Sequence, residues 1–413
     1  MMNIYIKYKL LFLLAGFLSL PITAQEDLED YLQLAASNNP GVQAAYAQFE
    51  AALQKSPQVS SLPDPTLTVS AFGRMMESSM GAEEAVFSLM QMFPWFGTLE
   101  ARGNVANLMA EAQFQNYLDV RNKLFFEVKS AYAQLYEVEK TIELQEENLE
   151  ILDSYKDLSL SRFSSGGGQM VDVVRIDIQK EGALTAIEVL RDQLEPLEAD
   201  FNLMLNRSPE LPVQIADTLV FNWNESQLDP VLKDHPAVQQ FESQKRAYEA
   251  QQELARKEGM PMLGLGLDYT IMSKTPMGMP EMNGDDAFMP MLSVSLPIFR
   301  KKYKAIRKEA EFMTTAMEQE GQRQQNELRS QYELSLFELK KAETLIDLYN
   351  RQIESSEQAR SLLISAYSTA TGNFDEVLRM NQDIIMLKTQ RLNAIRSGVT
   401  AQARMDYLSS KTE

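Results

Sequence analysis

The chain has 413 residues, a formal net charge of −19 at pH 7 and no cysteine. The negative charge argues against nucleic-acid binding, which requires a basic surface. The lack of cysteine excludes disulfide bonds, a thiol nucleophile and an N-terminal lipid anchor on cysteine. The length alone predicts two or three domains, but the sequence contains an internal repeat, which favours one architecture built from two halves.

Residues 1–24 have the pattern of a secretory signal peptide. Lys7 and Lys9 precede an apolar core that ends at Leu20, and cleavage is expected near Ala24. A core of about eleven apolar residues is too short to cross a bilayer as a helix. No run of about eighteen apolar residues follows, so no transmembrane helix is expected. The protein is therefore predicted to be exported, as a secreted or periplasmic protein or as an outer-membrane β-barrel.

The first repeat, residues 25–206, starts with a helical pattern and continues with a β-hairpin. The hairpin is predicted over residues 65–94, where Leu67, Val69 and Ala71 alternate with polar residues. A period of two indicates strands whose two faces differ in polarity.

A long helix is predicted after this hairpin. Residues 98–163 contain no proline and a single glycine, Gly103. One uninterrupted helix over this stretch would be roughly 100 Å long. A tip at residues 164–169 ends it, because three consecutive glycines accept a sharp reversal at little cost, and a returning helix runs to about Asn206.

Residues 207–234 contain three prolines and are interpreted as an equatorial connector between the two halves. The second repeat, residues 235–413, then restarts with a helix. Its further predicted elements are a hairpin at 261–297, a long helix at 300–371, a tip at 372–373 and a returning helix.

A shift of 204 residues places the first tip on the second. Gly168 then falls on Gly372, and Arg175 falls on Arg379. The same shift aligns two sets of residues spaced seven apart, the pattern of a coiled-coil seam. These sets are Val128, Leu135, Ile142 and Leu149 in the first repeat, and Tyr332, Leu339, Ile346 and Ile353 in the second. One hairpin, one seam and one tip are thus duplicated in the same order.

This order of elements resembles that of TolC-type outer-membrane efflux proteins over essentially the whole mature chain. The matching local features are Tyr367, Gly372 and Val377-Leu378 at the tip, and Pro94 and Pro297 after the second strand of each hairpin. The resemblance implies a mainly α fold with two membrane β-hairpins. It also implies a homotrimer that forms a periplasmic α-barrel and a 12-stranded outer-membrane β-barrel. The implied partners are a periplasmic adaptor protein, an inner-membrane pump of the RND type and outer-membrane lipid.

Physical arguments support an oligomer independently of the resemblance. An isolated hairpin is marginally stable in water, and an open sheet edge is not tolerated in lipid. Four strands are too few to close a barrel, so several copies are required. By alternation, the lipid-facing residues of the third strand are Leu263, Leu265, Leu267 and Tyr269, and the lumen-facing ones are Gly264, Gly266, Asp268 and Thr270.

Methionines gather around both hairpins, which hold or adjoin 13 of the chain's 23 methionines. Alternation turns Met90, Met92, Met289 and Met291 toward the lumen. Thioethers select Cu(I) over hard cations, so these four residues are a candidate metal site and Cu(I) or Ag(I) a candidate cargo, as in a heavy-metal branch of the family. The alternative is that methionine only fills irregular apolar space.

The tips around Gly168 and Gly372 are expected to contact the adaptor and to form a closed entrance. The resemblance places an acidic ring of the family at Glu376, whereas the next acidic position of the family is Arg379 here. We therefore predict a gate held shut by interhelical salt bridges, each worth only about 0–1 kcal/mol. Its residues are Asp172, Arg175, Glu376 and Arg379. Ion binding at Glu376 is the alternative to pairing with arginine.

No catalytic constellation and no cofactor motif occur in the sequence, so the chain is not expected to be an enzyme. The single histidine, His235, precedes Pro236 at a helix start and is interpreted as local turn chemistry. The predicted function is the exit duct of a tripartite efflux system. The alternatives are a duct of the same fold for drugs or type I secretion, and a periplasmic coiled-coil scaffold without channel activity.

Overall fold

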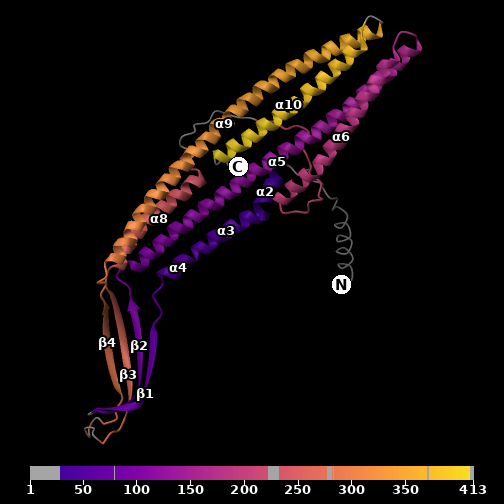
Figure 1. Cartoon of the computed structure of the whole chain (residues 1–413). Coiled ribbons are helices and arrows are strands. Elements are labelled where there is room, and N and C mark those ends of the chain that lie inside the picture. Colours follow the sequence, from indigo (N-terminus) through magenta and orange to yellow (C-terminus); the bar gives the residue numbers. More distant parts are fainter. Residues whose placement is uncertain are drawn as a thin grey trace, which may run out of the picture. The chain divides into compact units, whose positions relative to one another are not determined.

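The computed structural model describes residues 28–78, 80–221, 232–276, 281, 283–369 and 372–409. The predicted signal peptide at 1–24 and part of the connector, 222–231, lie outside these residues. Helices dominate the described part, with one group of strands (Figure 1). The elements are α2 Leu28–Asn38, α3 Pro40–Leu53, α4 Lys55–Ser60, β1 Thr66–Ser78, β2 Gly81–Phe93, α5 Thr98–Ser164, α6 Met170–Met204, α8 Pro236–Glu258, β3 Met262–Ser273, β4 Ala287–Ser295, α9 Lys301–Ser368 and α10 Phe374–Leu408.

Two compact units divide the chain, and each draws on both predicted repeats. Unit 1 lies within residues 1–42, 121–226 and 332–413, and unit 2 within residues 43–120 and 227–331. The long helices α5 and α9 run through both units. The duplication therefore describes the order of the elements, whereas the compact units combine equivalent segments of the two copies.

Unit 2 contains one antiparallel sheet in which the two hairpins lie side by side in the order β1-β2-β3-β4. Leu89 of β2 lies opposite Leu67 of β1 on one side and Leu267 of β3 on the other. In β4, Leu292 lies opposite Leu265. Because residues directly opposite each other share a face, one face of the sheet is apolar, as the alternation predicts.

The helices of unit 2 pack through aromatic rings and ion pairs. Rings of Phe49 and Phe114 lie 5.1 Å apart between α3 and α5. Two ion pairs link α5 to α8, at 2.8 Å between Arg102 and Glu258 and at 2.7 Å between Arg246 and Glu111.

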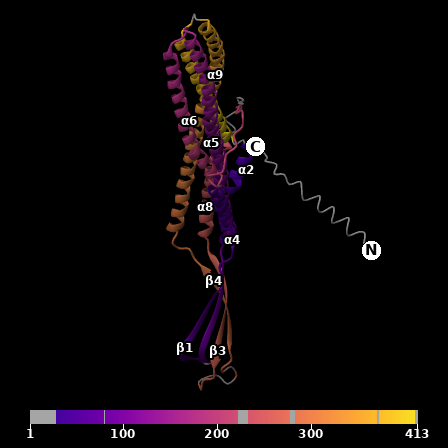
Figure 2. The same cartoon turned by 90° about the vertical axis from the view of Figure 1, so that its right-hand side faces the viewer.

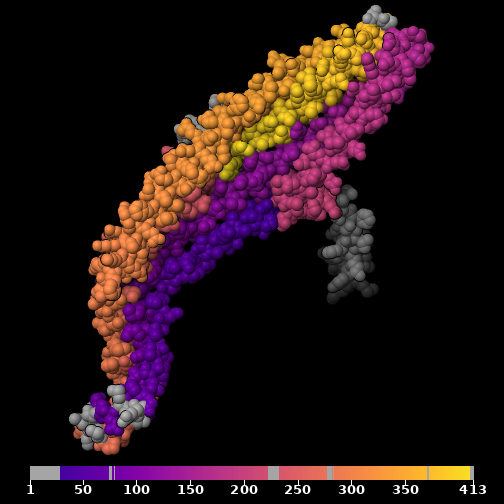
Figure 3. All heavy atoms as spheres, viewed as in Figure 1, coloured from indigo at the N-terminus to yellow at the C-terminus, as the bar shows by residue number. Residues whose placement is uncertain are grey.

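Unit 1 contains the predicted coiled-coil seams. Val128, Leu135 and Leu339 are fully or almost fully buried, and the other seam residues are buried or half-buried. The helix α10 borders α9 on one side and the first-repeat helices on the other (Figure 3). The two helical hairpins, α5–α6 and α9–α10, are thus packed together in this unit, as burial of a heptad seam requires.

Equivalent residues cap α3 in the first repeat and α8 in the second. Nδ1 of His235 accepts a hydrogen bond from the Ala237 amide at 3.2 Å, with Pro236 in the first turn. Asn39, its counterpart, accepts from the Gly41 amide at 2.8 Å. The interpretation of His235 as local turn chemistry is confirmed, because side-chain acceptors at this position satisfy free amides of the first turn.

Within the described residues, no helix combines the length and the apolar character that crossing a membrane requires.

Candidate functional site

The tip of each helical hairpin turns on a glycine that approaches the preceding helix closely. Gly168 donates its amide to the Arg162 carbonyl at 3.1 Å, and Gly372 donates to the Ala366 carbonyl at 3.1 Å. A side chain at Gly168 would approach the Phe163 nitrogen to 3.0 Å, and one at Gly372 would approach the Tyr367 nitrogen to 2.8 Å. Both turns therefore require glycine for space, and the duplication extends to individual hydrogen bonds.

One apolar cluster beneath the tips joins all four long helices, and both tips lie side by side in Figures 1 and 2. At its centre the rings of Tyr367 and Phe374 lie 4.8 Å apart. The cluster consists of Leu152, Tyr155, Ile176, Tyr367, Phe374, Val377 and Leu378. Burial raises the pKa of the Tyr155 hydroxyl. The two tips are thus held together by a shared core.

Asp375, which the sequence analysis did not single out, is the centre of the charged network at the tips. Its carboxylate lies 3.1 Å from Arg175 of α6 and 2.6 Å from Arg379, one turn further along α10. Glu376 is exposed and forms no ion pair with any described residue. Asp172 is buried and accepts a long hydrogen bond of 3.5 Å from the Tyr367 hydroxyl. The structure therefore brings the two predicted arginines together on Asp375 and leaves Glu376 apart.

Arg162 is a second tip residue that the sequence analysis did not identify. Its guanidinium lies 4.8 Å from the centre of the Tyr367 ring and donates to the Tyr367 carbonyl. The same group donates to the Gly167 carbonyl at 2.7 Å. One arginine of the first repeat thus binds both tips through its planar set of donors.

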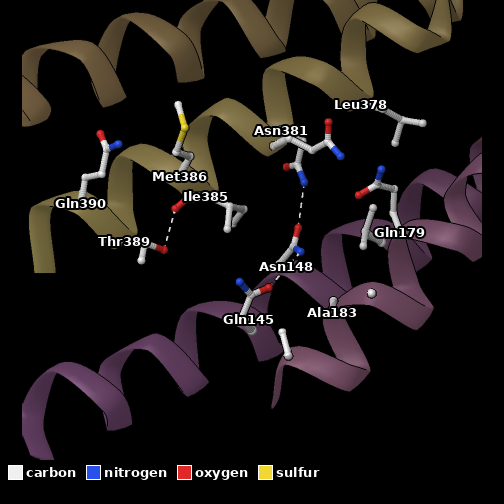
Figure 4. A pocket seen from close by; sticks show the side chains of 14 residues that line it. Gln145, Asn148, Gln179, Ala183, Leu378, Asn381, Ile385, Met386, Thr389 and Gln390 are labelled. Carbon is white, nitrogen blue, oxygen red and sulfur yellow. Dashed lines mark hydrogen bonds between the residues drawn. The ribbon is translucent and has the colours of Figure 1, made fainter. Parts of the chain in front are cut away.

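A cavity of about 420 Å³ lies behind the tips between α5, α6 and α10 (Figure 4). Asn381 donates to the Asn148 side-chain oxygen at 2.7 Å within it, and both residues are buried. Arg360 of α9 donates to the Asn381 oxygen at 3.2 Å. This buried amide pair joins the two repeats by a hydrogen bond.

The four predicted methionines share one face of the sheet, opposite the apolar face. Met90 and Met291 lie in one row on either side of Gly266, while Met289 lies opposite Asp268. A side chain at Gly264 would come within 2.6 Å of the Met92 sulfur, and one at Gly266 within 2.7 Å of the Met90 methyl. The glycines of β3 therefore leave room for the thioethers of β2.

Asp268 is a buried carboxylate on the methionine face, where it accepts a hydrogen bond from the Ser88 hydroxyl. In the described part of the chain, no three histidine, cysteine, aspartate or glutamate side chains form a group able to hold a metal ion. The methionine face thus carries thioethers, the hydroxyls of Ser88 and Ser293, and the Asp268 carboxylate.

The match to a known sequence family falls within the first repeat. Residues 31–206 match the model of the outer membrane efflux protein family. No curated protein sequence matches the chain significantly.

Solved structures match almost the whole chain at low sequence identity. The structure of CusC, described in terms of transmembrane channel formation, is 14% identical, with a TM-score of 0.78 over 94% of this chain and 92% of that one. The outer-membrane channel OprN is 17% identical, with a TM-score of 0.76 over 93% and 90%. The outer membrane protein VceC of Vibrio cholerae is 14% identical, with a TM-score of 0.73 over 92% and 96%.

The matched family model is that of efflux proteins and OprN is an outer-membrane channel, in line with the prediction that the chain is not an enzyme. The predicted resemblance is confirmed in sequence over residues 31–206, which match the outer membrane efflux protein model, and in fold over almost the whole chain, which is similar to the CusC and OprN structures.

Proposed function

We propose that this protein is the outer-membrane exit duct of a tripartite efflux system. The observation that carries the proposal is the sheet of unit 2, whose apolar face is solvent-exposed in a single chain. Leu67 is 62% exposed and Leu292 is 71% exposed on that face. Surfaces of this kind mark contact with a membrane or a partner.

The edges of the sheet support a trimer. Strands β1 and β4 each have one neighbour in the order β1-β2-β3-β4, so both edges carry unpaired backbone groups. Such edges are not tolerated in lipid. Three copies of four strands would join edge to edge into a 12-stranded barrel, with the apolar face toward lipid and the methionine face toward the lumen. The helices would then continue as a periplasmic tube.

The tips fit the closed periplasmic mouth of such a tube. Gly168 and Gly372 would contact an adaptor that recruits an inner-membrane pump of the RND type. Asp172, Arg175, Glu376 and Arg379 are the proposed gate, with Asp375 as the acid that holds both arginines. Exposed pairs of this kind are worth about 0–1 kcal/mol each, which suits a gate that has to open.

Copper(I) or silver(I) is the proposed cargo, carried past Met90, Met92, Met289 and Met291. Support comes from the placement of these thioethers on one face together with Asp268. Ducts of the same fold for drugs or for type I secretion are the competing functions, because the pump rather than the duct can select the cargo. In those cases the methionines would only fill space.

The duct is tested by fractionating cells that express the full-length protein. We expect the mature protein in outer-membrane detergent extracts, as a trimer that resists dissociation in a heated gel sample. Recovery in the soluble periplasmic fraction would instead support the coiled-coil scaffold.

The cargo is tested by copper tolerance in cells that depend on this duct. Changing Met90, Met92, Met289 and Met291 to leucine together should lower tolerance, because leucine keeps the volume and removes the sulfur. Met170→Leu combined with Met386→Leu, outside the sheet, is the matched control and should leave tolerance unchanged. Wild-type tolerance in the fourfold variant would reject the metal cargo while leaving the duct intact.

A further inference from the structure

A run of cations follows the last strand of the sheet. Six basic residues occur within nine positions of a chain whose net charge is −19. All six are exposed. This basic segment consists of Arg300, Lys301, Lys302, Lys304, Arg307 and Lys308.

The basic segment is unfavourable for the helix that carries it. The N-terminus of a helix has a positive partial charge, so cations in the first turn are destabilising there. The helix α9 has no acidic residue in its first turn, whereas the equivalent helix α5 has Glu100. Lys308 pairs with Glu311 at 2.9 Å. Across the described residues, Arg300, Lys301 and Lys304 have no carboxylate partner. Helix stability therefore does not explain this charge.

Large apolar side chains surround the same end of the sheet. Phe299, next to Arg300, is 82% exposed, and Phe96 after β2 is 81% exposed. The strand ends lie together, because Phe93, Leu263 and Val294 stand opposite one another across β2, β3 and β4. Figure 1 shows these strands joining α5, α8 and α9 at this end. Cations therefore flank exposed aromatic rings, the composition of a membrane–water boundary.

The opposite end of the sheet has the opposite charge. Glu83 and Glu84 lie near the start of β2, and Asp286 immediately precedes β4. Asp286 accepts a hydrogen bond from the Met272 amide at 3.1 Å. These acidic residues thus lie at the end of the strands opposite the basic segment, which stands where the chain leaves the sheet for its long helix.

We propose that the basic segment binds the phosphate groups of anionic phospholipids in the membrane leaflet around this end of the sheet. The inference rests on the proposed function, because it requires the sheet to lie in a membrane. Ammonium and guanidinium groups form charge-assisted hydrogen bonds with phosphate oxygens. Basic residues at an anionic lipid surface each strengthen binding by about fivefold. The neighbouring aromatic rings would lie at the level of the headgroups.

Native mass spectrometry of the full-length protein in detergent tests the proposal, with phosphatidylglycerol and phosphatidylethanolamine as probes. We expect tighter binding of phosphatidylglycerol. Changing Lys301, Lys302 and Lys304 to glutamine should weaken that binding by about a hundredfold, at fivefold per residue. The matched control changes Arg323, Lys340 and Lys341, on the same helix, to glutamine and should retain the wild-type preference. Equal affinity for both lipids, or an unchanged preference in the first triple variant, would overturn the proposal.

Two further measurements separate the possible failures. Thermal unfolding without added lipid should show the triple variant at least as stable as wild type, because it relieves charge repulsion, and phosphatidylglycerol should raise the Tm of wild type only. An equal rise in both proteins would also overturn the inference.

Outer-membrane fractionation tests the proposed function independently of the lipid site. If the wild-type protein is absent from the outer membrane, the proposed duct is rejected. If it is present there but shows no lipid preference, only the lipid site is rejected.

Discussion

The helical hairpins α5–α6 and α9–α10 are equivalent by sequence, yet different interactions close them. In the first, Lys156 pairs with Asp177 at 2.7 Å, and the hydrogen bond that Lys156 donates to this carboxylate raises the pKa of Lys156. At the same positions of the second hairpin, Arg360 donates to the neutral amide of Asn381 at 3.2 Å. Glu146 pairs with Arg191 at 2.6 Å in the first, whereas its equivalent Asn350 accepts at 3.3 Å from Arg391, which is not the equivalent of Arg191.

The amide of Asn381, at the position equivalent to the Asp177 carboxylate, also contacts the first repeat. An aspartate can only accept, whereas Asn381 accepts from Arg360 and also donates to Asn148 of the first repeat. Where the first hairpin has an ion pair, the second has a hydrogen bond within the hairpin and another that reaches the first hairpin. Divergence of a duplicated element can in this way supply the contacts that join the copies.

The largest expected difference between the hairpins concerns the tip core. Phe374 is 1% exposed, whereas its equivalent Met170 is 49% exposed. Phe374→Ala should cost about 3–5 kcal/mol, because it removes a buried ring and leaves a cavity. Met170→Ala should change stability by within about 0.5 kcal/mol. Urea unfolding of the purified protein measures both, and equal effects would contradict the asymmetric core.

The amide bridge should give a smaller difference. Asn381→Ala leaves the buried Asn148 amide without its partner, which costs about 1–3 kcal/mol. Asp177→Ala, the equivalent change in the first hairpin, breaks an exposed ion pair and should cost about 0–1 kcal/mol. If Asn148→Ala and Asn381→Ala prove additive in a double-mutant cycle, the proposed bridge between the repeats is wrong.

The smallest expected difference between the hairpins concerns Glu139, whose burial should make the free energy of unfolding depend on pH. Burial raises the pKa of Glu139, with Glu143, Glu198 and Asp217 adding to the rise and Lys140 opposing it. The folded state therefore holds this proton more tightly than the unfolded state, so stability falls as pH rises from the ordinary glutamate pKa to the raised one.

Glu139→Gln should remove this fall and become more stable relative to wild type across that window. The equivalent Glu343 is exposed, so Glu343→Gln serves as the control and should follow the wild-type profile. Thermal unfolding measured at a series of pH values compares the three proteins, and parallel profiles for Glu139→Gln and wild type would reject the effect.

The sequence predicts those features that depend on local period and on duplication. The seam of Val128 and Leu135 is buried, and the alternation in β2 and β3 places Met90 beside Gly266. Gly168 and Gly372 make equivalent turns. These features repeat along the chain and need no knowledge of distant contacts.

The contacts of Asp375 and Arg162 at the tips could not be predicted from the sequence, because they join segments far apart in the chain. Successive residues of a helix point about 100° apart, so Asp375 faces Arg175 while the adjacent Glu376 points elsewhere. Neither the role of Asp375 nor the contact of Arg162 with Tyr367 has a local sequence signal, because each depends on how two hairpins about 200 residues apart pack together.

Single-channel conductance in planar lipid bilayers tests the account most directly. Asp375→Asn weakens the pairing of both arginines and should raise the conductance above that of wild type, as should charge reversal at Arg175 and Arg379. Asp383→Asn, about two turns further along the same helix, exposed and outside the proposed gate, is the matched control and should conduct as wild type does. Channels with the wild-type conductance in Asp375→Asn, or no channels from any of these proteins, would contradict a duct closed at its tips.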